Sequence, residues 1–128
     1  MATMTVIKPG TGGALDAISP PNIVAGLNNT GNTPSAAGTT DVFLNDGRTA
    51  VLLECGATSA GTYRFLKKKP NSESLTHDRV MTLSANARFW IGPFNTDDFN
   101  NQSGQVECRL DSGGTIGGLK VHCVSLAG

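Results

Sequence analysis

The sequence lacks an excess of charge of either sign, since ten Lys and Arg balance ten Asp and Glu in 128 residues. No overall field therefore draws the chain towards nucleic acid or an anionic membrane, and we expect neither as a partner. Aromatic residues make up only 5% of the chain, with one Trp and one Tyr. That is little material for a sugar-stacking face. Any partner must be recognised by local contacts.

Long apolar runs are also missing. No stretch approaches the roughly 18 apolar residues that a membrane-spanning helix needs, and residues 1–13 show no basic region followed by an apolar one. We expect cytoplasmic synthesis without a classical secretion signal. The three cysteines, Cys55, Cys108 and Cys123, include no Cys-x-x-Cys pair. An odd number without such a pair argues against a disulfide framework and a structural zinc site.

Turn residues are abundant, and they divide the second part of the chain into short segments. With 16 Gly and β-branched or apolar runs broken every ten or so positions, the pattern from Asp41 onward favours many short strands. Strands are expected at 48–55, 62–68, 79–85, 88–91, 105–111 and 119–126, the last two as a hairpin around the glycine-rich turn 112–118. The prediction is all-β: a single small antiparallel β-sandwich or barrel, jelly-roll-like, over residues 41–128.

Residues 1–40 form an extended N-terminal arm in this interpretation. They hold four of the six prolines and only two charged side chains, Lys8 and Asp16. Such a segment buries too little apolar surface to offset its ordering entropy. Its apolar patches 4–7 and 23–27 suggest a strap that lies on a neighbouring surface, although a frayed terminus is the simpler alternative.

Phe89 and Trp90 are consecutive in a predicted strand, so one should enter the core while the other reaches the opposite face. Trp90 on that face would suit a subunit contact, with core burial as the alternative. Trp90 and the apolar residues of the arm are the candidate partner-binding residues. These are Met4, Val6, Ile7, Ile23, Val24, Leu27 and Trp90.

No residue pattern indicates catalysis, a cofactor or a metal. The three cysteines fall on apolar sides of strands, where a free thiol is usually inert core packing. His122 is adjacent to Cys123, and neighbours on a strand point to opposite faces, so the two cannot form a catalytic dyad. Asp97 and Asp98 offer oxygen ligands for calcium, but the EF-hand spacing is absent. We therefore predict no enzyme and no small-molecule substrate.

The only basic run, residues 67–69, follows Tyr63, Arg64 and Phe65. An aromatic and basic strand can bind single-stranded nucleic acid. Because the whole chain is neutral, we favour a role in blocking edge-to-edge aggregation.

Two motifs carry a resemblance to a known family. Residues 41–49 read Asp-Val-Phe-Leu-Asn-Asp-Gly-Arg-Thr, and residues 90–94 read Trp-Ile-Gly-Pro-Phe, followed by Phe99-Asn100. This order resembles small structural proteins encoded among the head genes of tailed bacteriophages, over about residues 41–126. The resemblance implies a β-sandwich or barrel decoration (cement) protein, made in the host cytoplasm. Such a protein binds the major capsid protein on the virion surface, often as a homotrimer.

Two other roles remain open. The same domain could form rings as a tail-tube or head-to-tail joining subunit. A carbohydrate- or receptor-binding module is the third class, with few aromatic residues to support it.

Overall fold

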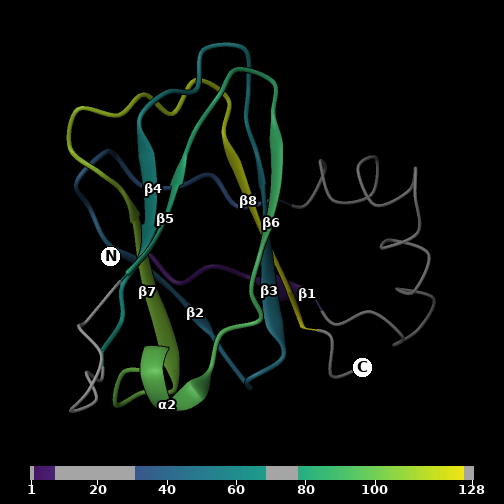
Figure 1. Ribbon diagram of the computed structural model, residues 1–128, viewed down its shortest axis with the longest axis vertical. Coiled ribbons are helices and arrows are strands. Elements are labelled where there is room, and N and C mark those ends of the chain that lie inside the picture. Colours follow the sequence, from purple (N-terminus) through teal and green to yellow (C-terminus); the bar gives the residue numbers. More distant parts are fainter. Residues whose placement is uncertain (1, 8–30, 69–77, 126–128) are drawn as a thin grey trace.

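The computed structural model describes residues 2–7, 31–68 and 78–125 and shows an all-β sandwich of two four-stranded sheets (Figure 1). In order, sheet A contains β2 (Asp41–Leu44), β7 (Gln105–Leu110), β4 (Thr62–Phe65) and β5 (Arg79–Thr82). Sheet B contains β1 (Val6–Ile7), β8 (Lys120–Ser125), β3 (Thr49–Glu54) and β6 (Arg88–Ile91). Neighbouring strands are antiparallel, apart from the parallel pair β1 and β8. The sandwich predicted from the sequence is confirmed.

The core lies between the sheets and is centred on aromatic side chains. Phe43, Tyr63, Phe65 and Phe94 are fully buried, and the ring centroids of Phe65 and Phe94 lie 4.9 Å apart. Strand β7 supplies Val106, Cys108 and Leu110, which alternate with half-buried polar residues. This period of two is the pattern expected of a strand with one face on the core.

The predicted hairpin of the last two strands is wrong. Strand β7 pairs with β2 and β4 in sheet A, whereas β8 pairs with β1 and β3 in sheet B. The apolar faces of β7 and β8 are both on the core. They meet it from opposite sheets, so the glycine-rich connection crosses between sheets.

The connection between β6 and β7 contains one helical turn, α2 (Thr96–Phe99). Asn95 caps it, because its side-chain oxygen accepts a hydrogen bond of 2.7 Å from the backbone N–H of Asp97. The turn places Phe99 in the core, 5.3 Å from the Phe94 ring.

The predicted role of the lysines in edge protection is wrong as well. They follow β4, which lies between β7 and β5 in the interior of sheet A. Lys68 instead forms an ion pair of 2.7 Å with Glu107, and Lys69 lies outside the described residues.

The described parts of segment 1–40 are hydrogen-bonded to the sandwich. The Met4 N–H donates to the Val42 carbonyl at 2.7 Å, and the Val42 N–H donates to the Ala2 carbonyl at 2.9 Å. The buried Asp41 carboxylate accepts from the backbone N–H groups of Ala2 and Ser35. Residues 2–7 thus close one side of the sandwich, with Met4 in the core.

The two motifs that carry the family resemblance lie side by side. The Asn45 amide donates to the Phe94 carbonyl at 3.0 Å and to Asn100 Oδ1 at 2.7 Å. Asn100 returns a bond of 3.1 Å to the Asn45 carbonyl. The motifs are therefore structural, since their polar groups join β2 to the end of β6 and to α2.

Candidate docking surface on the outer face of sheet B

The outer face of sheet B carries a row of large side chains across its width. The register places Leu52 of β3 opposite His122 of β8 on one side and opposite Trp90 of β6 on the other. Directly paired strand residues share a face. Leu52 and His122 are buried but lie outside the core cluster, which contains their chain neighbours Val51, Leu53, Val121 and Cys123. The row His122–Leu52–Trp90 therefore faces away from the core.

This face is buried although it is on the outside. Leu52 is 2% exposed and His122 is 1% exposed, while Ala50 and Val124, which pair in the adjacent row, are 6% and 0% exposed. Most of β3 and β8 is accordingly buried on both faces. Trp90, on the edge strand, remains 49% exposed. Apolar residues on both faces of a strand are typical of a sheet covered on both sides.

His122 has an unsatisfied nitrogen. Its Nε2 lies 3.2 Å from Glu54 Oε1, a contact that fits a neutral ring donating from Nε2. Its Nδ1 is then an acceptor, and this buried atom has no hydrogen-bond partner among the residues that the structure describes. Burial lowers the pKa of His122, and Glu54 offsets part of this effect. A neutral imidazole with one unused acceptor faces outward from the sheet.

Charged residues border the row at one end. Lys120, Glu54 and Arg88 pair across β8, β3 and β6, and Arg88 Nε lies 3.3 Å from Glu54 Oε2. A cavity of about 310 Å³ lies at this border and is also lined by Asn86 and Gly118. The face is thus an apolar band with a polar rim, which is the usual composition of a protein-binding surface.

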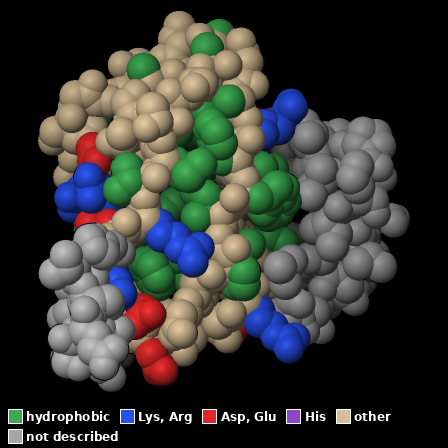
Figure 2. Space-filling view, in the orientation of Figure 1, with side chains coloured by type: hydrophobic (Ala, Val, Ile, Leu, Met, Phe, Trp, Pro, Cys, Tyr) green, Lys and Arg blue, Asp and Glu red, His purple; other side chains and the backbone are tan. Residues whose placement is uncertain are grey.

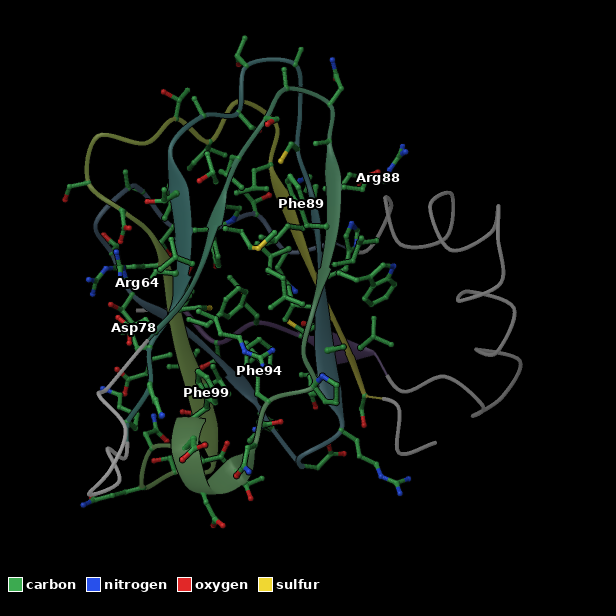
Figure 3. The ribbon with its side chains drawn as sticks, in the orientation of Figure 1. Arg64, Asp78, Arg88, Phe89, Phe94 and Phe99 are labelled. Atoms are coloured by element: carbon green, nitrogen blue, oxygen red, sulfur yellow. The ribbon has the colours of Figure 1, made fainter. Side chains whose placement is uncertain are left out.

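On the side of the sandwich opposite β1 and β2, the edge strands of the two sheets are β6 and β5. Figure 2 shows apolar side chains gathered along the middle of this view, with charged groups around them. Phe89 points into the sandwich while Arg88 points away from it (Figure 3). Val80 is 41% exposed on β5. The side chain of Arg79 is exposed at this edge, and its Cζ lies 5.5 Å from the Phe94 ring centroid.

The candidate partner-binding residues have separate locations. Trp90 is exposed and Phe89 packs on the core, which is the division of the pair expected from strand geometry. Met4 is 5% exposed inside the chain's own core, and Val6 is partly buried against it, so neither offers a free surface. Ile7 belongs to β1. Ile23, Val24 and Leu27 lie outside the described residues.

The three cysteines are buried, and Cys108 and Cys123 belong to the core between the sheets. Burial raises the pKa of Cys108 to about 12 and that of Cys123 well above its usual value. The Tyr63 hydroxyl donates to the Cys108 sulfur at 3.3 Å. These thiols stay protonated at neutral pH and act as core packing.

Other features of the described residues are structural. There is no group of three His, Cys, Asp or Glu placed to hold a metal ion within residues 2–7, 31–68 and 78–125. Asp97 and Asp98, the candidate calcium ligands, lie in the first turn of α2. No helix in those ranges is long and apolar enough to cross a membrane. A second cavity, of about 570 Å³, lies between the N-terminal segment and the turn after β2, with the exposed Leu44 in its lining.

Sequence reasoning missed the row itself. It predicted a strand over residues 48–55, but it did not connect Leu52 with His122 and Trp90. The only signal was the presence of apolar residues on both faces of β3 and β8.

Comparison of the chain with family models, curated proteins and solved structures finds no match.

Proposed function

We propose that this protein is a structural virion protein that binds the exterior of a phage capsid and stabilises it. The observation that carries the proposal is the outward row on sheet B that ends in Trp90, which is 49% exposed beside the buried Leu52. Trp is enriched among the residues that dominate binding energy at protein interfaces. The Asn-Asp-Gly-Arg-Thr and Ile-Gly-Pro-Phe motifs add the resemblance to decoration proteins.

The proposed partner is the major capsid protein, and the proposed oligomer is a homotrimer. A capsid lattice presents the same site many times, so a trimer can engage several sites with individually weak contacts. A single half-exposed Trp with a polar rim suits such a contact, because each copy needs only modest affinity.

The direct test is to add the purified chain to particles that lack it and to measure co-sedimentation. Wild type should bind. Trp90→Ala should bind at least about tenfold more weakly if Trp90 is a hot spot that contributes roughly 2 kcal/mol. Leu44→Ala is the matched control, because Leu44 is 59% exposed on the other sheet. Particles that take up no wild-type chain would contradict the proposal.

Sedimentation of the isolated chain separates this function from a tail-tube or joining role. A trimer supports decoration. A hexamer or larger ring would replace the proposal with the ring-forming role, in which the same sandwich contacts two neighbours head to tail.

A further inference from the structure

Strand β6 is an edge of sheet B, and half of its backbone groups face away from the sheet. In an antiparallel pair, successive residues direct their N–H and C=O groups alternately towards the partner strand and away from it. The Cys55 N–H donates to the Ala87 carbonyl at 2.8 Å, so Phe89, two residues further along, also bonds to β3. Arg88 and Trp90 therefore direct their N–H and C=O groups to the open edge, where no described strand pairs with them.

Strand β5 is the edge of sheet A on the same side of the sandwich (Figure 1), but its inward side chains differ from those of β6. Arg79 lies opposite the buried Phe65 and so faces inward, with its Cζ 5.5 Å from the Phe94 ring centroid. A charge that points inward from an edge strand is one of the devices that prevent pairing with a further strand. The inward residues of β6, Phe89 and Ile91, are apolar and pack on the core. Of these two edges, β6 is the one without that protection.

The side chains of β6 offer a contact on each face of the sheet. Phe89 is only partly buried against the core, and Trp90 is 49% exposed on the outer face. A strand added beside β6 would place one side chain next to each ring. Cross-strand pairs between aromatic and β-branched residues stabilise a sheet. Apolar residues at two successive positions of the added strand therefore fit this edge.

The charge on this side favours an acidic residue in the added strand. Arg79 is exposed and forms no ion pair with a carboxylate of the described residues. It faces the space between the sheets, which the inward side chains of a strand on β6 would enter, and a carboxylate there can accept from its guanidinium. A second copy of the chain is a poor occupant. A twofold contact joins the same surface of both copies, so it would bring two Arg79 side chains together.

We propose that β6 accepts an extended segment of a partner protein as an additional strand of sheet B. The segment carries apolar side chains beside Phe89 and Trp90 and one carboxylate directed at Arg79. In such strand addition, main-chain hydrogen bonds give affinity and the side chains give specificity. The inference specifies the contact that the proposed function assigns to Trp90, and it rests on that function only for the identity of the partner.

The probe is a capped synthetic peptide, Thr-Thr-Asp-Val-Val-Thr-Thr, added to the wild-type chain and followed by NMR. The Arg88 and Trp90 amides should exchange rapidly with solvent in the free chain, and at least about tenfold more slowly at saturating peptide. Val80 is the internal control. Its N–H faces the open edge of β5, because Met81 bonds to β4, and its exchange should not change. The same peptide N-methylated at its first Val, whose N–H would face β6, should not bind.

Four results would overturn the proposal. The first is unchanged exchange of Arg88 and Trp90 at about 1 mM peptide. The second is slower exchange of Val80 instead, which would place the added strand on sheet A. The third is an equal effect of the N-methylated peptide, which would show a contact without strand addition. The fourth is slow exchange of both β6 amides before peptide is added. If dilution then speeds that exchange, a second copy occupies the edge, and if it does not, the chain itself does.

Variants separate the backbone contribution from that of the side chains, with Trp90 fluorescence as the measure of affinity. Arg88→Pro removes an N–H that faces the open edge, where an edge strand tolerates proline, and should weaken binding about threefold to tenfold. Arg88→Gln keeps this N–H, and Val80→Pro makes the same change on β5, so both should bind as wild type. Arg79→Gln should weaken binding of the peptide but not of its Asn analogue.

Unchanged affinity of a folded Arg88→Pro chain, or equal losses in Arg88→Pro and Val80→Pro, would contradict strand addition to β6. The exchange measurement on the wild-type chain gives its answer even if the proline variant does not fold. Particle binding is scored separately. A chain that binds the peptide but not particles contradicts the proposed function alone, whereas a chain that binds particles without slower exchange at Arg88 and Trp90 contradicts strand addition alone.

Discussion

The outer faces of sheets A and B are built from different residues. On sheet A, Arg64 reaches Asp111 at 3.0 Å and Asp78 at 3.1 Å, and Lys68 pairs with Glu107. Arg64 and Asp78 lie together on the outside of that sheet (Figure 3). On sheet B, the corresponding surface is an apolar row with one histidine. The outer face of sheet A therefore carries charge pairs, while in sheet B most of β3 and β8 is buried on both faces, as in an interior layer.

The largest expected contrast is between leucines on the two outer faces. Leu52 on sheet B is 2% exposed, whereas Leu44 on sheet A is 59% exposed. Leu52→Ala should lower the free energy of unfolding by about 2–4 kcal/mol, because it leaves a cavity at a buried position. Leu44→Ala should change it by less than about 0.5 kcal/mol. Urea unfolding measures both, and equal losses would show that the two faces are equally solvated.

A second expected effect concerns the charge pairs of sheet A. Asp111 accepts hydrogen bonds from Arg64, Thr62 and Arg109, and these partners, Arg64 above all, lower its pKa from 3.8 to about 2. Asp111→Asn should cost about 1–3 kcal/mol of unfolding free energy at neutral pH, since a charged acceptor is lost. Asp97→Asn, at an exposed position, serves as the control and should cost less than about 0.5 kcal/mol.

The pH dependence of Asp111 follows from the same pKa. Because the folded pKa lies below the unfolded value, the stabilisation is present above about pH 4 and is lost as the pH falls towards about 2. Asp111→Asn should flatten that part of the stability curve. A variant whose acid unfolding follows wild type would contradict the assigned role.

The alternation of residues within single strands was enough to predict the sandwich, the apolar-side placement of Cys108 and the opposite placement of Phe89 and Trp90. Pairing between strands was not predictable in the same way. The hairpin of β7 and β8 was expected because they are adjacent in sequence, yet each pairs with strands far away along the chain. The sequence also separates residues that the fold joins, such as Met4 and Val42.

The docking row was missed for the same reason. Leu52, His122 and Trp90 become neighbours only through the register of β8, β3 and β6. A short apolar strand looks the same in sequence whether its second face meets solvent or a cover. Leu52 in β3 and Val124 in β8 both had this ambiguity, and it is their burial that resolves it.

The smallest expected effect is the pH response of His122 on sheet B. Burial lowers its pKa below 6.5, against the opposing influence of Glu54 on β3, while Lys120 on its own strand lowers it further. Arg88 of β6 pairs with the other oxygen of Glu54. The unfolded chain binds a proton near pH 6.5 and the folded chain does so only at lower pH. The stabilisation is therefore complete above pH 6.5 and declines as the pH falls towards the folded pKa.

His122→Gln tests this response, because its amide can still donate to Glu54 but does not titrate. The variant should show a flatter dependence of unfolding free energy on pH below 6.5 than wild type, measured by urea unfolding at several pH values. This effect should persist at high salt, since it arises from burial and not from screened surface charge. On sheet A, by contrast, salt should weaken the contribution of the half-exposed pair Lys68 and Glu107. If salt removed the His122 response instead, the imidazole would be solvated, and the outer face of sheet B would resemble that of sheet A.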